Sequence, residues 1–328
     1  MKAVLYNYGC TADEMKIGDA ETPSPLPDQI LVRVMAAGIN RADIMQREGK
    51  YPPPQGITPI LGLDMAGIVE DTGPAATKWK KGDKVFGLLP GGGYAEFAVI
   101  HQDMAMGIPA PLSFAEAASI PEVFLTAYQA ILWHSKLKKG ETVLIHAGAS
   151  GVGTAAIQIS KSIGAGVYVT ASKQKHEVCI KLGAEKAIDY KTEDFAERIK
   201  EFTGGKGADV IIDFISGPYF KKNIESLNID GRMVILASLG GGKVDEFDLR
   251  KILTKRLTVI GSALRSRTRE YRIELTKDFA GFALKKFETG ELKPVVDKVY
   301  DVKDVPEAHK YIEANKNSGK IVLDTENI

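Results

Sequence analysis

The sequence predicts an α/β fold, with a β-rich N-terminal lobe followed by a doubly wound parallel lobe that binds a dinucleotide. Up to about residue 120, short apolar runs are separated by proline and glycine clusters, which is typical of β structure. Beyond residue 140, strand-like and helix-like segments alternate, which indicates βαβ units around a parallel sheet. Within this part, residues 143–153 have the pattern of a strand, a glycine-rich turn and the start of a helix.

In the first lobe, the pattern predicts several short strands and then a change to helical periodicity. Ser113 and Glu116 have the spacing of a helix capping box. Pro121 is expected to open a second helix that runs through Leu132. The expected strands cover residues 1–6, 29–36, 66–70, 84–87 and 94–100.

In the second lobe, six strands are expected to alternate with helices, and Thr192 is a candidate N-cap for the third of those helices. The strands are expected at residues 143–147, 167–170, 186–189, 210–215, 232–238 and 257–261. The helices between them are expected at residues 157–163, 177–182, 193–202 and 220–227. A further helix near 269–289 and a last strand near 320–323 follow. The expected division is therefore 1–121, 122–262 and a segment 263–328 that returns to the first lobe.

The turn after the first of these strands has the arrangement Gly148-x-Ser150-x-x-Gly153, with an additional Gly151. Such a turn lets backbone N–H groups approach a pyrophosphate at a helix N-terminus, and the same pattern also fits an ordinary tight turn. Serine replaces the second glycine of the usual fingerprint, so the flanking strand and helix carry the interpretation. The hydrolase elbow G-x-S-x-G is excluded, because Val152 stands where its last glycine belongs.

Composition excludes several classes of protein. The net charge of the 328 residues is +1 with both signs interspersed, which argues against nucleic acid as a partner. No apolar run of about 20 residues is present, so no membrane span is expected. The two cysteines, Cys10 and Cys179, have no paired spacing, which favours a reducing, cytoplasmic compartment and excludes a four-cysteine zinc lobe.

The end of the second strand of the parallel lobe predicts the cofactor. NAD sites usually carry a carboxylate there for the ribose 2′-hydroxyl. Here residues 170–175 offer Ser172, Lys173 and Lys175 and no carboxylate, which suits the 2′-phosphate of NADPH. A helix-terminal loop that is basic for other reasons is the alternative.

Four segments resemble the zinc-independent quinone oxidoreductases of the medium-chain dehydrogenase/reductase superfamily: residues 36–43 (AAGINRAD), 61–67 (LGLDMAG), 125–127 (LTA) and the 148–153 turn. Four more extend the resemblance to the tumour-suppressor-inducible branch of these enzymes: residues 45–51, 89–93, 264–267 and 308–317. The resemblance implies a GroES-like catalytic domain joined to a Rossmann domain. It also implies contrast with the zinc enzymes, which carry Cys at the position of Asn40 and Gly-His-Glu at Gly62-Leu63-Asp64. No metal is therefore expected, and His146, inside an apolar strand, is interpreted as a core residue.

The resemblance also implies which residues bind NADPH. Ser172, Lys175 and Tyr190 match the residues that surround the 2′-phosphate in relatives, and Lys173 is an alternative to Lys175. Backbone groups of the 148–153 turn would meet the pyrophosphate. Backbone groups of residues at the strand ends would meet the nicotinamide and ribose. The remaining expected contacts are Thr126, Ser150, Gly151, Val152, Gly153, Phe214, Ile215, Gly240, Leu264, Arg265, Ser266 and Asn317.

The implied reaction is transfer of a hydride, or of electrons, from the nicotinamide to a quinone bound in the cleft between the domains. Asn40 would orient substrate or nicotinamide, and Tyr51 would stack on the quinone or donate a proton to it. Asp43 and Gln46 would line the same pocket. Asn40 and Asp43 are also open to interpretation as helix caps, and solvent is an alternative proton donor.

Two further hypotheses remain at this point. Reduction of the activated C=C bond of an enone uses the same hydride geometry, and a non-catalytic, crystallin-like NADPH-binding protein uses the same cofactor site. The resemblance also implies a homodimer joined through the edge strands of the cofactor sheets, with residues 257–261 as the candidate edge.

Overall fold

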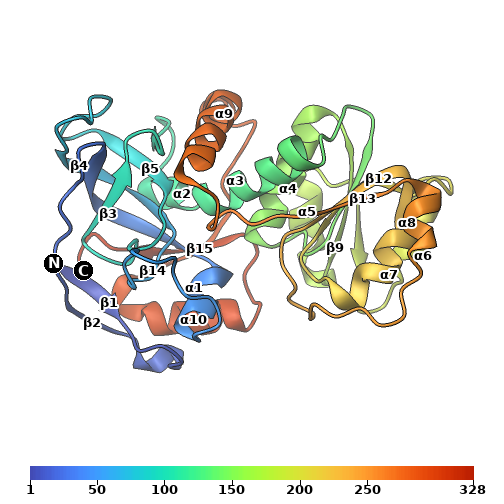
Figure 1. Ribbon diagram of the computed structural model, residues 1–328, viewed down its shortest axis with the longest axis horizontal. Coiled ribbons are helices and arrows are strands. Elements are labelled where there is room, and N and C mark those ends of the chain that lie inside the picture. Colours follow the sequence, from blue (N-terminus) through green and yellow to red (C-terminus); the bar gives the residue numbers. More distant parts are fainter. The chain divides into compact units, whose positions relative to one another are not determined.

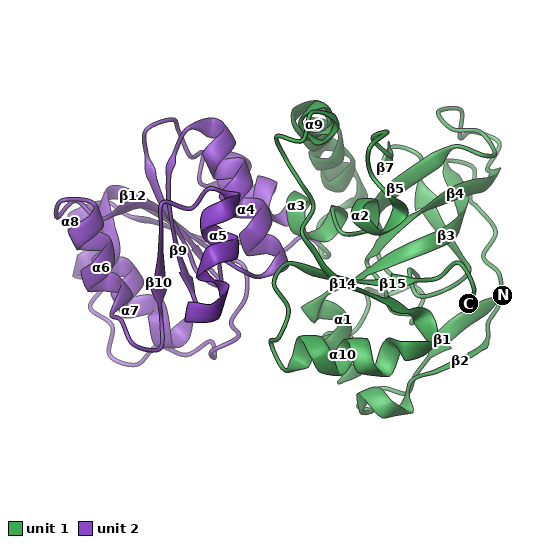
Figure 2. Cartoon of the chain, turned by 180° about the vertical axis from the view of Figure 1, so that it is seen from behind, with its two compact units in different colours: residues 1–125, 265–328 green, residues 126–264 purple.

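The computed structural model describes residues 1–328, which form two compact units (Figure 2). Residues 1–125 and 265–328 make up the discontinuous unit, and residues 126–264 the continuous unit. The C-terminal segment belongs to the first unit because its last strand, β15 (Lys320–Asp324), pairs antiparallel with β3 (Gln29–Ile39). In that pairing Ile321 lies opposite Ile39 and Leu323 opposite Ala37, and all four side chains are buried.

The discontinuous unit is built on a seven-stranded sheet in the order β14-β15-β3-β4-β5-β7, with β6 pairing the first half of β3. One apolar core lies between β3, β4, β5 and β6, and a second lies between β3, β15 and the C-terminal helix. The remaining strands of this sheet are β4 (Asp64–Thr72), β5 (Lys84–Leu88), β6 (Phe97–His101), β7 (Ala105–Gly107) and β14 (Val296–Asp301).

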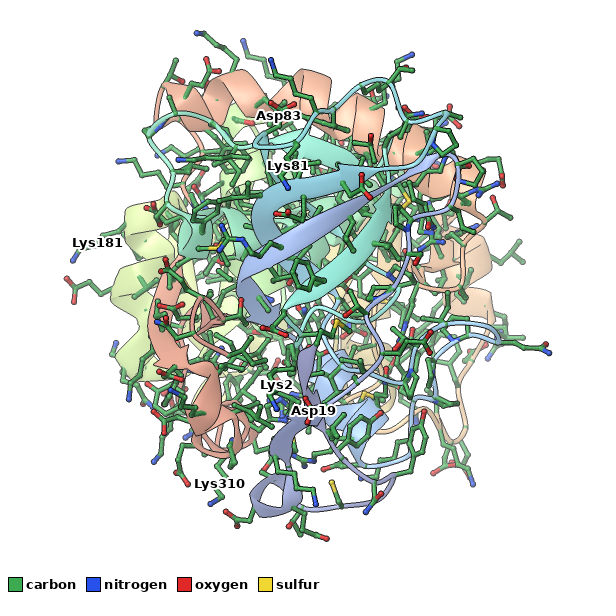
Figure 3. The ribbon with its side chains drawn as sticks, turned by 90° about the vertical axis from the view of Figure 1, so that its left-hand side faces the viewer. Lys2, Asp19, Lys81, Asp83, Lys181 and Lys310 are labelled. Carbon is green, nitrogen blue, oxygen red and sulfur yellow. The ribbon has the colours of Figure 1, made fainter.

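A separate two-stranded ribbon, β1 (Lys2–Leu5) and β2 (Lys16–Asp19), begins the chain. Lys2 lies opposite Asp19 in its register, and the ammonium and carboxylate are 2.8 Å apart on the surface (Figure 3). The helices of this unit are α1 (Arg41–Arg47), α2 (Phe114–Ala118), α9 (Arg269–Glu288) and α10 (Val305–Glu313), with 3₁₀ turns at Ala12–Glu14 and Val302–Asp304. The predicted capping box of α2 is confirmed, because Ser113 Oγ accepts from Glu116 N and the Glu116 carboxylate accepts from Ser113 N.

The continuous unit is a parallel six-stranded sheet in the order β10-β9-β8-β11-β12-β13. The first strand along the chain, β8, therefore lies inside the sheet, and the order reverses between β8 and β11. Helices α4 and α5 lie on one face of the sheet and α6, α7 and α8 on the other (Figure 1). The strands are β8 (Thr142–Ile145), β9 (Gly166–Ala171), β10 (Lys186–Asp189), β11 (Ala208–Asp213), β12 (Leu227–Ile235) and β13 (Thr258–Gly261). The helices are α4 (Gly151–Ile163), α5 (His176–Leu182), α6 (Phe195–Phe202), α7 (Gly217–Ser226) and α8 (Arg250–Lys255).

This doubly wound sheet beside a β-rich unit confirms the predicted fold class. Helix α3 (Pro121–Tyr128) begins at Pro121 as expected, and then widens into a π-helical turn at Gln129–His134. The prediction that Thr192 caps the third helix was wrong: Asp194 is the N-cap of α6 and accepts from Ala196 N at 2.8 Å. The Thr192 hydroxyl instead bonds the carboxylate of Asp189 at 3.2 Å. None of the helices is long and apolar enough to span a membrane.

Candidate functional site

The glycine-rich turn joins the end of β8 to the first turn of α4. Ser150 is the N-cap of α4, and its hydroxyl accepts from Gly153 N at 3.0 Å. The first N–H groups of an α-helix have no partner within the helix, so those of Gly151 and Val152 are available to an anion. The serine that replaces a fingerprint glycine thus completes the helix start and leaves the phosphate-binding groups in place.

Two glycines of this turn are required by close packing. A Cβ atom on Gly148 would lie 2.6 Å from Cβ of Val169 on the neighbouring strand β9. A Cβ atom on Gly153 would overlap the carbonyl oxygens of Ala147 and Gly148. The chain therefore brings helix, turn and sheet together as a dinucleotide fingerprint requires.

The residues expected around a 2′-phosphate follow two neighbouring strands. Ala171 at the end of β9 lies opposite Asp189 at the end of β10, so the next residues along, Ser172 and Tyr190, emerge at the same edge of the sheet. Ser172 is buried, and its carbonyl accepts from Lys175 N at 2.8 Å in a short 3₁₀ turn. Tyr190 and Lys173 are exposed. The structure thus groups a hydroxyl, a phenol and a basic turn where the adenosine ribose is expected.

Further expected cofactor contacts lie at the ends of β11 and β12. Gly240 N donates to Ile215 O at 3.0 Å, and Leu239 N donates to Phe214 O at 3.0 Å, so these two strand ends are held together. The hydroxyl oxygen of Thr126 is buried and has no hydrogen-bond partner. An unpartnered buried hydroxyl is costly unless a ligand meets it, which fits the expected ribose contact.

His146 is fully buried and fully bonded. Nδ1 lies 3.0 Å from the Thr170 hydroxyl, and Nε2 lies 2.7 Å from Oδ1 of Asn223. Asn223 Nδ2 donates to Asp213, so Asn223 Oδ1 is the acceptor and His146 carries its proton on Nε2. Burial lowers the pKa of His146. The imidazole is therefore a neutral core group, as predicted.

In the discontinuous unit, Asn40 lies in a buried polar cluster with Asp64 and Lys320. Its amide Nδ2 donates to Asp64 Oδ2 at 2.8 Å, and its Oδ1 accepts from Lys320 Nζ at 2.7 Å. Lys320 Nζ also lies 2.8 Å from Asp64 Oδ2 and donates to Ile39 O at 2.8 Å. The amide of Asn40 is thus held at both ends by the protein. Lys320, which the sequence analysis treated only as the start of a strand, is the cation of this cluster.

Asp43 acts as a structural cap. Its carboxylate accepts from Asn40 N at 2.8 Å and from Gly62 N at 3.1 Å, which ties the start of α1 to the 61–63 loop. The Tyr94 hydroxyl lies 3.3 Å from Asp43 Oδ2 and 3.4 Å from His309 Nε2. Burial raises the pKa of Asp43 to about 6 against these hydrogen bonds.

The chain of polar groups continues from His309 to Arg47. Arg47 Nη1 is 3.2 Å from His309 Nδ1, and Arg47 Nη2 is 2.6 Å from Glu313 Oε1. Because Arg47 has only donors, His309 accepts at Nδ1 and carries its proton on Nε2, toward Tyr94. Burial, together with the Arg47 cation, lowers the pKa of His309 to about 3. These residues hold α1 against α10.

Arg265, whose backbone is expected to meet the cofactor, directs its side chain to Gln46 and Tyr51. Arg265 Nη2 donates to Gln46 Oε1 at 2.7 Å and to Pro90 O at 2.9 Å. Its guanidinium carbon lies 5.3 Å from the centre of the Tyr51 ring. The remaining nitrogen, Nη1, is buried and has no hydrogen-bond partner. Two expected substrate residues are thus joined by a cation that retains one free donor.

Glu122, at the start of α3, is a residue that the sequence analysis missed. Its backbone N–H donates to Asp64 Oδ1 at 2.6 Å. Burial, followed by the negative charge of Asp64, raises its pKa from the ordinary 4.5 to about 7. The charge of Glu122 also contributes to a raised pKa of Tyr51, after burial. Its position after Pro121, at a predicted helix start, was the one available signal.

Three further residues are expected to contact the cofactor. Leu264 ends the continuous unit, while Ser266 lies in the discontinuous unit and is exposed. Asn317 donates from Nδ2 to Gly319 O at 2.8 Å within its own loop. Their contacts with a cofactor stay predictions.

Two family models match the chain. The alcohol dehydrogenase GroES-like domain matches residues 26–110, within the discontinuous unit. The zinc-binding dehydrogenase model matches residues 151–279, which include most of the parallel sheet. Both matches agree with the fold described above.

Relatives match over the whole chain. A human quinone oxidoreductase is 32% identical over 327 residues, which cover 98% of this chain and 97% of the relative. The structure of a quinone oxidoreductase from Pseudomonas syringae pv. Tomato DC3000 is 29% identical with a TM-score of 0.87, covering 99% of each chain. The CurK enoyl reductase is 28% identical with a TM-score of 0.86, covering 98% of each chain.

The zinc in the description of one family model does not fit the residues present here. An ammonium, Lys320 Nζ, bonds both Asp64 and Asn40, and Asn40 stands where the resembling zinc enzymes carry Cys. Leu63 adds an apolar side chain, and no group of three or more His, Cys, Asp or Glu residues in the chain is arranged to hold a metal ion. The fold, the fingerprint turn and the full-length relatives together show that the chain belongs to the quinone oxidoreductase-like proteins of the medium-chain dehydrogenase/reductase superfamily.

Proposed function

We propose that this protein is an NADPH-dependent, zinc-independent quinone oxidoreductase. The observation that carries the proposal is the pairing of Tyr51 with Arg265, whose buried Nη1 has no partner. An aromatic ring and a free guanidinium donor suit a flat acceptor whose oxygen becomes negative on reduction. Similarity to quinone oxidoreductases supports the same reaction.

Family membership implies a nicotinamide cofactor, which when bound supplies the hydride or electrons. The protein's own residues bind and orient the acceptor. Gln46 Oε1 and Pro90 O fix the guanidinium of Arg265, and its Nη1 donates to one quinone oxygen while the ring of Tyr51 contacts the quinone. Since a quinone delocalises incoming charge over two carbonyl groups, one cationic donor replaces the Lewis acid that a simple carbonyl substrate needs.

Glu122 is the proposed proton donor near this acceptor. With its pKa raised to about 7, this carboxyl group binds and releases a proton near neutral pH. Its charge acts on both Tyr51 and Arg265, which indicates that it lies near the acceptor residues. Asn40 is fixed by Lys320 and Asp64.

The proposed preference for NADPH rests on Ser172, Tyr190 and the two lysines of the 173–175 turn. Their position at the ends of adjacent strands suits three or four contacts to a 2′-phosphate. Gly151 and Val152 supply the pyrophosphate donors, and Thr126 a ribose contact. We also propose that the chain belongs to the tumour-suppressor-inducible branch of these enzymes.

Reduction of an enone C=C bond is the second candidate. The similarity to the CurK enoyl reductase supports it, and the same guanidinium would stabilise an enolate oxygen. A crystallin-like binding role predicts NADPH affinity without turnover on either class of acceptor.

We also propose a homodimer formed by the edge strand β13. This strand ends the parallel sheet, and Val259 on it is exposed. Leu249, the N-cap of the preceding helix α8, is 71% exposed, and Leu253 within that helix is 75% exposed. An apolar surface therefore adjoins the open edge. An uncovered apolar edge is a liability that pairing with a second copy removes.

The test of the acceptor site is Arg265→Met. Loss of one preorganised charged donor is expected to lower kcat/KM for a quinone by about 100-fold. The Kd of NADPH, measured by fluorescence, is expected to change by less than about threefold, since only backbone groups of residues 264–266 are assigned to the cofactor. Arg250→Met, at an exposed arginine paired with Asp248, is the matched control. Equal kcat/KM in the Arg265 variant and the control would contradict the proposed role.

A further inference from the structure

A groove of about 430 Å³ lies in the discontinuous unit, apart from the side chains assigned above to the quinone. Strand β6, the 56–60 loop, the 90–92 loop and the first turn of α9 form its walls. Neither Tyr51, Asn40 nor Glu122 lines it. Its volume lies in the range of small-molecule sites.

Most of the groove surface is apolar. Ile57, Ile60 and Phe97 are partly buried along it, Met104 is buried, and Leu26 at its rim is 58% exposed. A leucine exposed to this degree beside other apolar side chains marks an exposed apolar patch, which is typical of a binding groove. A hydrocarbon or aromatic body is the group that such walls accept.

One partly buried cationic side chain in this groove has no counter-charge. The side chain of Arg272 lines the groove, its Nε is buried without a hydrogen-bond partner, and no carboxylate forms an ion pair with it. Glu270 acts on Arg272 only at longer range, and Glu21, which also lines the groove, is not among the charges that shift it. Burial lowers the pKa of Arg272, so the protein itself does not compensate the cation.

The neighbouring charges are already paired. Arg269 lies 3.4 Å from Asp28, and the same carboxylate is 3.1 Å from His101 Nε2. Arg272 is therefore the cationic side chain left for an incoming anion. A single guanidinium that presents Nε–H and a terminal N–H along one edge matches the two oxygens of a carboxylate.

We propose that this groove binds an amphipathic monocarboxylate, with the carboxylate on the guanidinium of Arg272 and the apolar body along Ile57, Ile60 and Phe97. The site is distinct from quinone reduction and does not rest on that function. A phosphate needs more positive charge than one arginine with an occupied neighbour supplies, and a neutral apolar molecule would leave Nε unsatisfied.

The test is calorimetric titration of the full chain, without cofactor or quinone, using decanoate below its micelle concentration. Saturable binding of one decanoate per chain is expected, and 1-decanol, with the same chain and no charge, is expected to bind at least about tenfold more weakly. Arg272→Met is expected to weaken decanoate binding at least about tenfold, because it keeps the length of the side chain and removes the fork. Arg250→Met, at an exposed arginine elsewhere, is expected to bind as the unchanged protein does.

A second variant protects the test against misfolding of the first. Ser24 lies exposed at the rim of the groove, so Ser24→Trp is expected to block it while leaving the unfolding temperature unchanged. Loss of decanoate binding in both folded variants supports the site. The proposal would be overturned by unchanged decanoate binding in either folded variant or by equal binding of 1-decanol. It would also be overturned if decanoate showed no saturable binding up to about 1 mM. Arg272-dependent binding of inorganic phosphate in place of decanoate would overturn the proposed ligand class.

Discussion

The ammonium of Lys320 lies 2.8 Å from the carboxylate of Asp64, and both groups are almost completely buried. The two residues are 256 positions apart, and they meet because β15 returns to pair with β3 beside the start of β4. Asn40 completes the cluster by bonding both of them. The protein therefore holds a fixed cation next to Asn40, the position at which the resembling zinc enzymes carry Cys.

This cluster predicts a large loss of stability in Lys320→Met. The change leaves the Asp64 carboxylate in the core without its counter-charge. It also removes the ammonium that donates to Asn40 Oδ1, and the expected cost is about 3–5 kcal/mol. The free energy of unfolding in urea measures it. Lys2→Met, at the exposed pair with Asp19, is the control and is expected to cost less than about 1 kcal/mol.

The double variant Lys320→Met, Asp64→Leu separates pairing from burial. Removing both charges is expected to cost clearly less than the sum of the single changes, because neither charge is then left alone. Additive costs would show that the two groups do not stabilise each other.

The raised pKa of Glu122 predicts a pH-dependent stability. Its pKa is about 7 in the fold and near 4.5 when the chain is unfolded, so the folded state binds the proton more tightly. The cost of ionising it is absent below about pH 4.5, grows as pH rises to about 7 and is complete above that. Glu122→Gln is therefore expected to stabilise the protein by about 3 kcal/mol at about pH 8 and to have little effect near pH 4.5.

Unfolding curves at several pH values check this, with Glu274→Gln at an exposed position of α9 as the control. A Glu122→Gln variant whose stability differs from the unchanged protein equally at all pH values would be inconsistent with a buried, titrating Glu122. A pH–rate profile that loses its step near neutrality in the same variant would connect this group to the reaction.

The proposed phosphate site predicts a change of cofactor preference. Ser172→Ala with Lys175→Ala removes a hydroxyl and a cation, and the ratio of kcat/KM for NADPH over NADH is expected to fall about 100-fold. Lys173→Ala tests the alternative lysine in the same assay. Lys181→Ala, exposed and paired with Glu177, is the control (Figure 3). An unchanged ratio in every variant would place the 2′-phosphate elsewhere.

The open edge of the parallel sheet predicts a dimer that a single charge disrupts. Val259→Arg on β13 is expected to convert a dimeric mass into a monomeric one in light scattering, because strand pairing would bury the guanidinium. Val299→Arg, at the exposed edge strand β14 of the other sheet, is the matched control and is expected to stay dimeric. A monomer at micromolar concentration before any substitution would reject the proposed dimer.

Local sequence patterns were sufficient for the parallel sheet and its turn. The Gly148–Gly153 spacing, the strand before it and the capping box of α2 each depend on neighbours within a few residues, and the structure has all of them. The prediction of the N-cap of α6 was wrong, although it also depended on neighbouring residues. Thr192 and Asp194 both suit an N-cap, and the sequence does not reveal the competing bond of Thr192 to Asp189.

The contacts of the candidate site depend on long-range packing and were mostly unpredictable. Lys320 and Arg265 meet their partners across 256 and 219 residues, respectively, and no periodicity encodes such a pairing. Strand β14 and helix α10 were also missed, since their short polar patterns become ordered only by packing on β15. Glu122 gained its raised pKa from burial beside Asp64, which the sequence alone does not reveal.

The central claim is quinone reduction with NADPH and without a metal. The most direct measurement is the initial rate of NADPH oxidation by an ortho-quinone, with NADH and an enone in parallel and a chelator present throughout. Turnover of the quinone with NADPH is expected, with a lower rate with NADH and no effect of the chelator. Binding of NADPH without oxidation by any quinone, or turnover that the chelator abolishes, would contradict it.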